Sequence, residues 1–273
     1  MRLRVGSVPY LNAKPLVDWF HSPDCNEDVE VVYAVPSELA RMVRAGEVDV
    51  CNCSIFESLS QPGLCLVPDI SISSDGPVKS VRLFAKKPAA NLKSVALDTS
   101  SLTSAALAKV ILSELYGCDP LYISHAPDLD QMLSACDAGL IIGDLKLFAL
   151  HADTQVYDLG ECWQRLTCLP FVYAAWQAPL AVQLKHPELP NILSRARDWG
   201  VARLDKLAKR WAVEMHLPYE RCLDYFTNAM DYDLGDRQLA GMNLYQDKCT
   251  NHGLIPTPPV RVPMFGGEDS PKY

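Results

Sequence analysis

The first 56 residues alternate between short apolar runs and segments with helical periodicity. Apolar, β-rich runs lie at Leu3–Val8, Val29–Val35 and Val48–Phe56, and helix-like segments fill the intervals between them. Strands that are joined through helices run parallel, because the helix returns the chain to the edge of the sheet where the previous strand began. Such crossovers are right-handed. This order predicts a β-α-β-α-β unit and places the chain in the α/β class.

A second α/β series begins near residue 94, after a stretch that contains only strand-like segments. Its strands are predicted at Ser94–Asp98, Leu121–Ile123 and Ala138–Asp144. Further β-rich segments flank this series at Val81–Phe84 and Val172–Trp176. Two domains in succession fit this pattern, and so does one lobe inserted into another through two crossing hinge strands.

Composition limits the partners that the chain can have. Its 273 residues carry a net charge of −8, which argues against a nucleic-acid surface and against attraction to anionic membranes, but not against a local site for an anion. No signal peptide or membrane-spanning apolar run is visible, so we expect a cytoplasmic protein with ten reduced cysteines. Cys51 and Cys53 form one isolated C-x-C, and no metal is expected.

The apolar run that opens the chain is followed by a polar turn with Pro9, Tyr10, Asn12 and Lys14. Ligands bind at such places in open α/β sheets, because strand ends and helix N-termini converge there. Asn12 has a competing role, since Asn is also a preferred cap of the helix that follows. The residues alone leave both roles open.

A hydroxyl-rich turn joins the predicted strand 94–98 to a strongly amphipathic helix. Ser100, Ser101, Leu102 and Thr103 lie where this helix begins. Free backbone N–H groups, the helix dipole and the hydroxyls can together bind a carboxylate, although ordinary capping uses the same residue types. The turn contains no glycine, so it is not a phosphate-binding P-loop.

Other polar candidates also lie at predicted strand ends. Gly143 and Asp144 end one strand, where an aspartate can bind a substrate hydroxyl, act as a general acid or base, or cap the next helix. An arginine near the suspected hinge can bind a carboxylate through two contacts, or it can form a structural ion pair. The remaining candidates are Asn52, Ser54, Ser80 and Arg82.

Five segments of the chain carry a family resemblance. They are GSVPYLNAKPL at 6–16, SVRLF at 80–84, LDTSSLTS at 97–104, IIGDL at 141–145, and the region 159–176, which ends in LPFVYAAW. Together, and in this order, they resemble the chorismate dehydratases of the futalosine route to menaquinone. The resemblance spans roughly residues 3–255.

That family is similar in fold to the type II periplasmic binding proteins. The resemblance therefore implies two lobes, mixed sheets with helices on both faces, and two crossing hinge strands. The expected lobes are residues 1–82 plus 176–273, and an inserted lobe of residues 83–175. Beyond Pro190 the sequence indicates mostly helices, and the Pro-, Gly- and charge-rich tail at 256–273 is predicted to be extended or partly disordered.

The resemblance implies loss of water from chorismate, a small dianion, to give 3-(1-carboxyvinyloxy)benzoate. Aromatisation drives this reaction, so no cofactor is expected. Asn12 has no useful basicity and is expected to donate a hydrogen bond that orients the substrate or steadies the leaving hydroxyl; the base is either the substrate's enolpyruvyl carboxylate or Asp144. The expected substrate-binding residues are Pro9, Tyr10, Ser54, Ser80, Arg82, Ser100, Ser101, Leu102, Thr103 and Gly143.

Two other functions share the expected fold. A solute-binding protein would bind a small anion without chemistry, and it would be expected to carry an export signal. The sister enzyme 1,4-dihydroxy-6-naphthoate synthase has an opening motif of the Ser-Pro-Cys-Pro-Asn-Asp-Thr kind, which differs from residues 7–14. The chain departs from the usual dehydratase pattern at Cys51, Cys53, Cys168 and residues 146–148.

Overall fold

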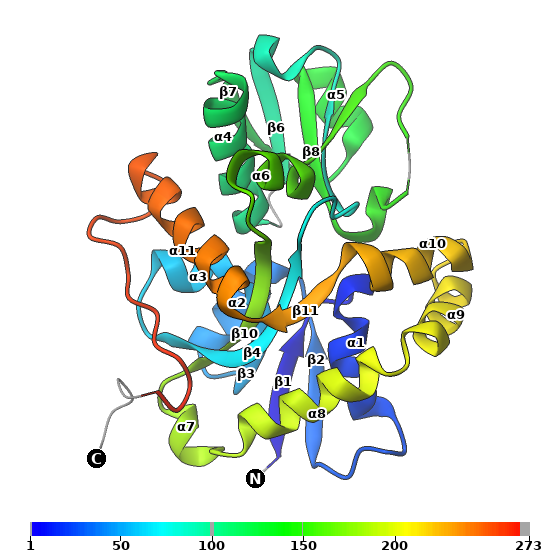
Figure 1. Ribbon diagram of the computed structural model, residues 1–273, viewed down its shortest axis with the longest axis vertical. Helices are drawn as coiled ribbons and strands as arrows, with labels where there is room; N and C mark the ends of the chain where they lie inside the picture. Colours follow the sequence, from blue (N-terminus) through cyan, green and yellow to red (C-terminus); the bar gives the residue numbers. More distant parts are fainter. Residues whose placement is uncertain (1, 99–100, 149, 268–273) are drawn as a thin grey trace.

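Two β-sheets, each in its own lobe, organise the chain (Figure 1). They are seen in a computed structural model that describes residues 2–98, 101–148 and 150–267. Both sheets combine parallel and antiparallel pairs and have helices packed on them. The α/β class and the mixed sheets expected from the sequence are thus confirmed.

The larger sheet is built around the opening strand β1. β1 pairs in parallel with β2 and β3, which is the predicted β-α-β-α-β unit, while β10 runs antiparallel to β3 and β4. β11 completes the sheet antiparallel to β4. The order across the sheet is β11 (Asp231–Leu234), β4 (Leu64–Ser74), β10 (Phe171–Pro179), β3 (Val50–Ser54), β1 (Leu3–Ser7) and β2 (Val29–Tyr33).

The second sheet contains the strands of the second α/β series. β6 pairs in parallel with β7 and β8, and β5 runs antiparallel to β8 and β9. The order across the sheet is β7 (Leu121–His125), β6 (Ser94–Asp98), β8 (Ala138–Ile142), β5 (Val81–Ala85) and β9 (Gln155–Asp158).

Helices cover both sheets, and local capping explains where several of them begin. Side-chain oxygens of Ser101, Asp128 and Asp158 accept backbone N–H groups at the starts of α4, α5 and α6. The helices are α1 (Lys14–Val17), α2 (Pro36–Arg44), α3 (Ile55–Ser60), α4 (Leu102–Tyr116), α5 (Leu129–Ala135), α6 (Leu159–Thr167), α7 (Val182–Lys185), α8 (Leu189–Val201), α9 (Leu204–Glu214), α10 (Tyr219–Asp224) and α11 (Asp236–Asn251).

The chain passes between the lobes twice, from β4 to β5 and from α6 to β10. An aromatic cluster packs beside the second passage: the rings of Phe171 and Tyr245 have centroids 5.0 Å apart, and those of Trp163 and Phe171 lie 5.2 Å apart. These rings join α6, β10 and α11. The lobe boundaries at 82/83 and 175/176 remain a prediction, and β5 and β10 each run continuously through one of them.

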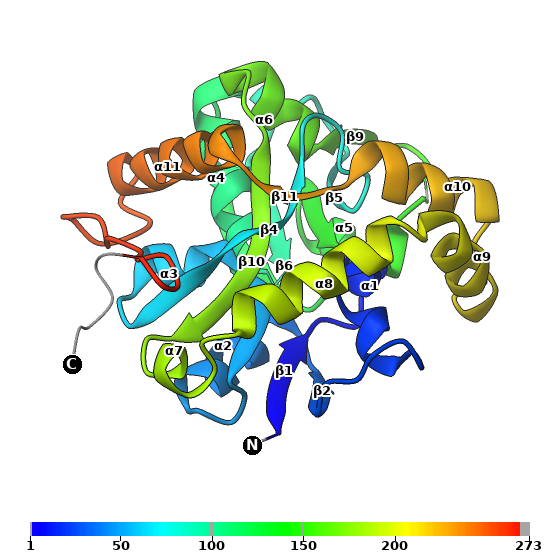
Figure 2. The ribbon, with the colours of Figure 1, turned by 60° about the horizontal axis from the view of Figure 1, so that its bottom comes forward.

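The C-terminal helices return to the first lobe. Figure 2 shows α8 crossing the larger sheet, where it packs against β4 and α1, and shows α11 alongside α4 of the second lobe. Further on, the tail pairs with β4, because Leu66 N–H donates to Pro263 O and Phe265 N–H donates to Leu66 O. Among the residues that the structure describes, no helix is long and apolar enough to cross a membrane.

The contact between α8 and α1 leaves no space for a side chain at Gly200. A Cβ atom there would lie 1.8 Å from the carbonyl oxygen of Pro15. We expect Gly200→Ala to lower the free energy of unfolding by about 1–3 kcal/mol, because the helix must move away. Urea unfolding measures this change, with the exposed substitution Asn191→Ala on the same helix as the control. Equal stability of the two variants would contradict this packing.

Candidate functional site

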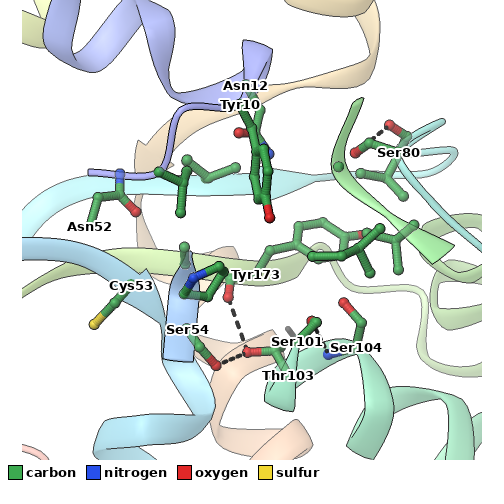
Figure 3. Close-up of a pocket in the computed structure, with 18 residues that line it drawn as sticks. Tyr10, Asn12, Asn52, Cys53, Ser54, Ser80, Ser101, Thr103, Ser104 and Tyr173 are labelled. Carbon is green, nitrogen blue, oxygen red and sulfur yellow. Dashed lines mark hydrogen bonds between the residues drawn. The ribbon is translucent and has the colours of Figure 1, made fainter. Parts of the chain in front are cut away.

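A pocket lies between the two lobes, where strands of both sheets end (Figure 3). About 580 Å³ of empty space lies within it, a volume that includes open solvent at its mouth. The pocket brings together seven of the residues predicted to form the site. These are Tyr10, Asn12, Ser54, Ser80, Ser101, Thr103 and Gly143.

Asn12 reaches the pocket from a short 3-10 helix, Leu11–Ala13, that follows β1. The helix that follows is α1, whose cap position is occupied by Ala13 and is not capped by any side chain, so the structure rules out the capping role for Asn12. The Asn12 side-chain oxygen is buried and has no hydrogen-bond partner among the described residues. It is therefore available to a ligand.

The Asn12 turn is fixed by contacts from the opposite lobe. The backbone N–H of Leu11 donates to the carboxylate of Asp144, at 2.9 and 3.2 Å from its two oxygens. Gly143 has a φ of 68°, and a Cβ atom there would lie 3.2 Å from the Tyr10 ring. Glycine is favoured at this position both by its backbone conformation and by the close ring.

Asp144 is affected strongly by its surroundings. Burial raises the pKa of its carboxyl to about 6, although the Leu11 N–H and the charge of Lys14 act in the opposite direction. Lys14 is itself buried, with its ammonium 3.9 Å from the centre of the Trp211 ring, and burial lowers the pKa of Lys14. Asp144 does not line the pocket; it lies behind the turn that does.

Hydroxyl groups form the wall opposite Asn12 (Figure 3). Thr103 Oγ1 donates to Tyr173 O at 3.2 Å and shares a hydrogen bond with the Ser54 hydroxyl, so α4 is connected to β10 and β3. Ser101 Oγ accepts the N–H of Ser104 at 3.2 Å. The first turn of a 15-residue helix therefore faces the pocket, together with its partial positive charge.

Polar side chains also close the two ends of the pocket. Ser80 is buried and accepts a hydrogen bond from the hydroxyl of Tyr225 at 2.8 Å. Asn52 lies at the other end in Figure 3. It was only a minor candidate in the sequence, because a polar residue on a buried strand is equally compatible with a structural role. Tyr173 was missed, since alternation along β10 does not reveal which face meets the pocket.

Three predicted substrate-binding residues do not line the pocket. Pro9 is exposed, and Leu102 is 41% exposed. Arg82 lines a different hollow, with its guanidinium 5.1 Å from the Phe84 ring centre. Ser100 lies outside the described residues. In the described part of the chain, no group of three or more His, Cys, Asp or Glu residues is placed to hold a metal.

Comparison with known proteins identifies the family. A family model described as menaquinone biosynthesis matches residues 3–251. The chain belongs to the menaquinone biosynthesis family. A chorismate dehydratase of Thermus thermophilus is 36% identical over 269 residues, which cover 90% of this chain and 95% of that protein. The family expected from the five sequence segments is confirmed.

Solved structures show the fold of this menaquinone biosynthesis protein. A protein of Archaeoglobus fulgidus matches with a TM-score of 0.74 at 14% identity, over 93% of this chain and 98% of that one. The periplasmic aliphatic sulphonate binding protein of Escherichia coli matches with a TM-score of 0.67 at 15% identity, over 100% and 96%. The fold is that of the periplasmic binding proteins, as the resemblance implied.

The raised pKa of Asp144 should make the stability of this family member depend on pH. In the folded protein the pKa of Asp144 is about 6, against the ordinary 3.8, so folding favours the protonated carboxyl. This contribution to the free energy of unfolding is fully present below about pH 4 and is lost as the pH rises through about 6. We expect unfolding free energies to fall by up to about 3 kcal/mol across this range, relative to Asp144→Asn. Urea titrations at each pH measure the difference.

The control for that titration is Asp247→Asn, which removes an exposed carboxyl. Its stability relative to the wild type should not show the same fall between about pH 4 and 6. A pH-independent difference between wild type and Asp144→Asn would contradict the buried state of Asp144.

Proposed function

We propose that this chain is a chorismate dehydratase, which removes water from chorismate to give 3-(1-carboxyvinyloxy)benzoate for menaquinone biosynthesis. The family match and the Thermus relative support the activity. The observation that carries it is the pocket, whose polar side chains are neutral hydrogen-bonding groups placed against the first turn of α4. Such a site can bind an anion and stabilise the charge that moves within it.

The first turn of α4 is the proposed binding site for the ring carboxylate. Loss of the C3 proton sends charge into this carboxylate, because the proton is conjugated to it through the ring. Ser101, Thr103 and Ser104 line the pocket there, and the helix dipole favours negative charge. This arrangement stabilises the intermediate more than the substrate, which is what catalysis requires.

Asn12 is proposed to hold the substrate near the reacting carbons. Its carboxamide lines the wall opposite α4, next to the Tyr225 hydroxyl with which it interacts. We propose that its nitrogen donates a hydrogen bond that orients the substrate or steadies the leaving hydroxyl when the substrate is bound. Tyr10 and Gly143 would close the pocket over the same region. The C3 hydrogen and the C4 hydroxyl lie on one ring face, which favours a stepwise elimination.

We assign the base to the substrate's own enolpyruvyl carboxylate. Both oxygens of Asp144 face Leu11 N–H, and Asp144 does not line the pocket. A base must come within hydrogen-bond reach of the proton that it removes. Asp144 is therefore proposed as a positioning residue, which holds the Asn12 turn in place.

The reaction requires no metal or redox cofactor, since aromatisation supplies its driving force. We also propose that the protein works in the cytoplasm. Its cysteines are free thiols in the described structure, and most of them are buried. Ten free thiols suit a reducing compartment.

The direct test of this function is incubation of the purified protein with chorismate. We expect the ultraviolet spectrum to change from that of the cyclohexadiene to that of an aromatic ring, with one product per chorismate consumed. No conversion at high protein concentration would contradict the dehydratase function. Binding of chorismate without conversion would favour a solute-binding protein, and turnover only of a naphthoate precursor would favour the sister enzyme.

Two substitutions separate the roles of Asn12 and Asp144. Asn12→Asp should lower kcat/KM for chorismate by about 100-fold or more, because it places a negative charge beside a dianion and removes a donor. Asp144→Asn should stay within about tenfold of wild type, since its amide oxygen can still accept the Leu11 N–H. Steady-state kinetics measure both. A loss in Asp144→Asn as large as that in Asn12→Asp would make Asp144 the base.

A further inference from the structure

Asn52 is a buried amide whose hydrogen bonds the protein does not supply. It lies on β3, its side chain is fully buried, and it lines the pocket at the end away from Ser80 (Figure 3). Neither its amide nitrogen nor its amide oxygen has a hydrogen-bond partner among the described residues. Burying an amide without partners costs free energy, so such a group indicates a ligand.

A nearby buried amide provides the contrast. Gln177 lies on the neighbouring strand β10, and its nitrogen donates to the carbonyl oxygens of Cys53 at 3.0 Å and Ser54 at 2.9 Å. That amide has a structural role, because its nitrogen pairs two carbonyl groups at the end of β3, although its own oxygen has no hydrogen-bond partner among the described residues. Gln177 does not line the pocket, so its oxygen does not indicate a ligand there. Asn52 makes no such bond, and its position in β3 directs it to the pocket instead.

The chemistry of a carboxamide restricts what can satisfy it. Its oxygen needs a donor and its nitrogen needs an acceptor. A carboxylate offers acceptors only, so it would leave the oxygen unpaired and repelled. On the proposed substrate, the only O–H donor is the C4 hydroxyl, which leaves in the reaction, and the ether oxygen on the adjacent carbon C3 is an acceptor.

We propose that Asn52 is the residue that recognises the C4 hydroxyl of chorismate. Its amide oxygen accepts the hydroxyl proton, and its amide nitrogen donates to the neighbouring ether oxygen at C3. The assignment rests on the proposed dehydratase function and adds a determinant of specificity to it. The product has lost the hydroxyl, so the Asn52 oxygen is left unpaired again and the product is bound less well than the substrate.

The test compares substrate and product in Asn52→Leu. This variant should lower kcat/KM for chorismate by about 10- to 100-fold, because the hydroxyl loses its buried acceptor. The inhibition constant of 3-(1-carboxyvinyloxy)benzoate should rise by only about threefold, because the product keeps the ether oxygen but has no hydroxyl to lose. Equal losses for both molecules would mean that Asn52 binds only groups that they share, and an unchanged kcat/KM would mean that it does not bind the hydroxyl; either result overturns the proposal.

Thermal unfolding without ligand separates this role from a structural one. Asn52→Leu should melt at or above the wild-type temperature, because it replaces an unpaired buried amide with an apolar side chain of similar volume. Gln177→Leu is the matched control and should melt lower, because it removes two hydrogen bonds. A fall for Asn52→Leu as large as that for Gln177→Leu overturns the proposal.

A second variant covers the case in which leucine does not fit. Asn52→Ser is smaller and should show the same selective loss for chorismate over the product. Wild-type activity is measured first, so that the two proposals fail separately. If the wild type is inactive, both the dehydratase function and the role of Asn52 are wrong. If the wild type is active and Asn52→Leu and Asn52→Ser are both fully active, only the role of Asn52 is wrong.

Discussion

The hydrogen bond from the Leu11 N–H to Asp144 connects the two lobes beside the pocket. It joins the turn after the first strand to the turn after β8, and these segments are more than 130 residues apart in the chain. Asn12 lies next to the donor and Gly143 next to the acceptor, so this contact holds together the two segments, one from each lobe, that form the Asn12 side of the pocket. Its carboxylate is buried, and that burial also raises the pKa of Asp144.

Among the described residues that line the pocket, none has a charged side chain, so the proposed dianionic substrate would contact only neutral groups there. The polar residues that line it are Tyr, Asn, Ser and Thr, and the helix α4 supplies a partial positive charge. Fixed neutral donors can follow charge as it moves within a substrate, whereas a permanent ion pair would stabilise the starting carboxylates most. This explains how a chain with a net charge of −8 can act on a dianion.

Sequence patterns predicted the class of the fold and much of the pocket, and the physical reason is different for the fold and for the pocket. Strand and helix periodicity located β1 to β3 and α4, and glycine with polar residues at strand ends pointed to Asn12, Thr103 and Gly143. Arg82 lies on a strand, as predicted, but the sequence does not show which face of the sheet its side chain is on. In the structure it lines a hollow other than the pocket. Asn52 was ambiguous, because a sequence shows that an amide is buried and not whether the protein pairs it.

Thr103 connects the start of α4 to the first lobe. Its hydroxyl bonds to Ser54 and to β10, and its carbonyl accepts the hydroxyl of Tyr245 on α11 at 3.0 Å, so the first lobe holds the start of α4 from three elements. The helix α4 therefore belongs to the second lobe, while its first turn is anchored to the first lobe. The side of the pocket that is proposed to bind the carboxylate is thus positioned by both lobes together, and a rotation of one lobe against the other would have to break these bonds or leave the first turn behind.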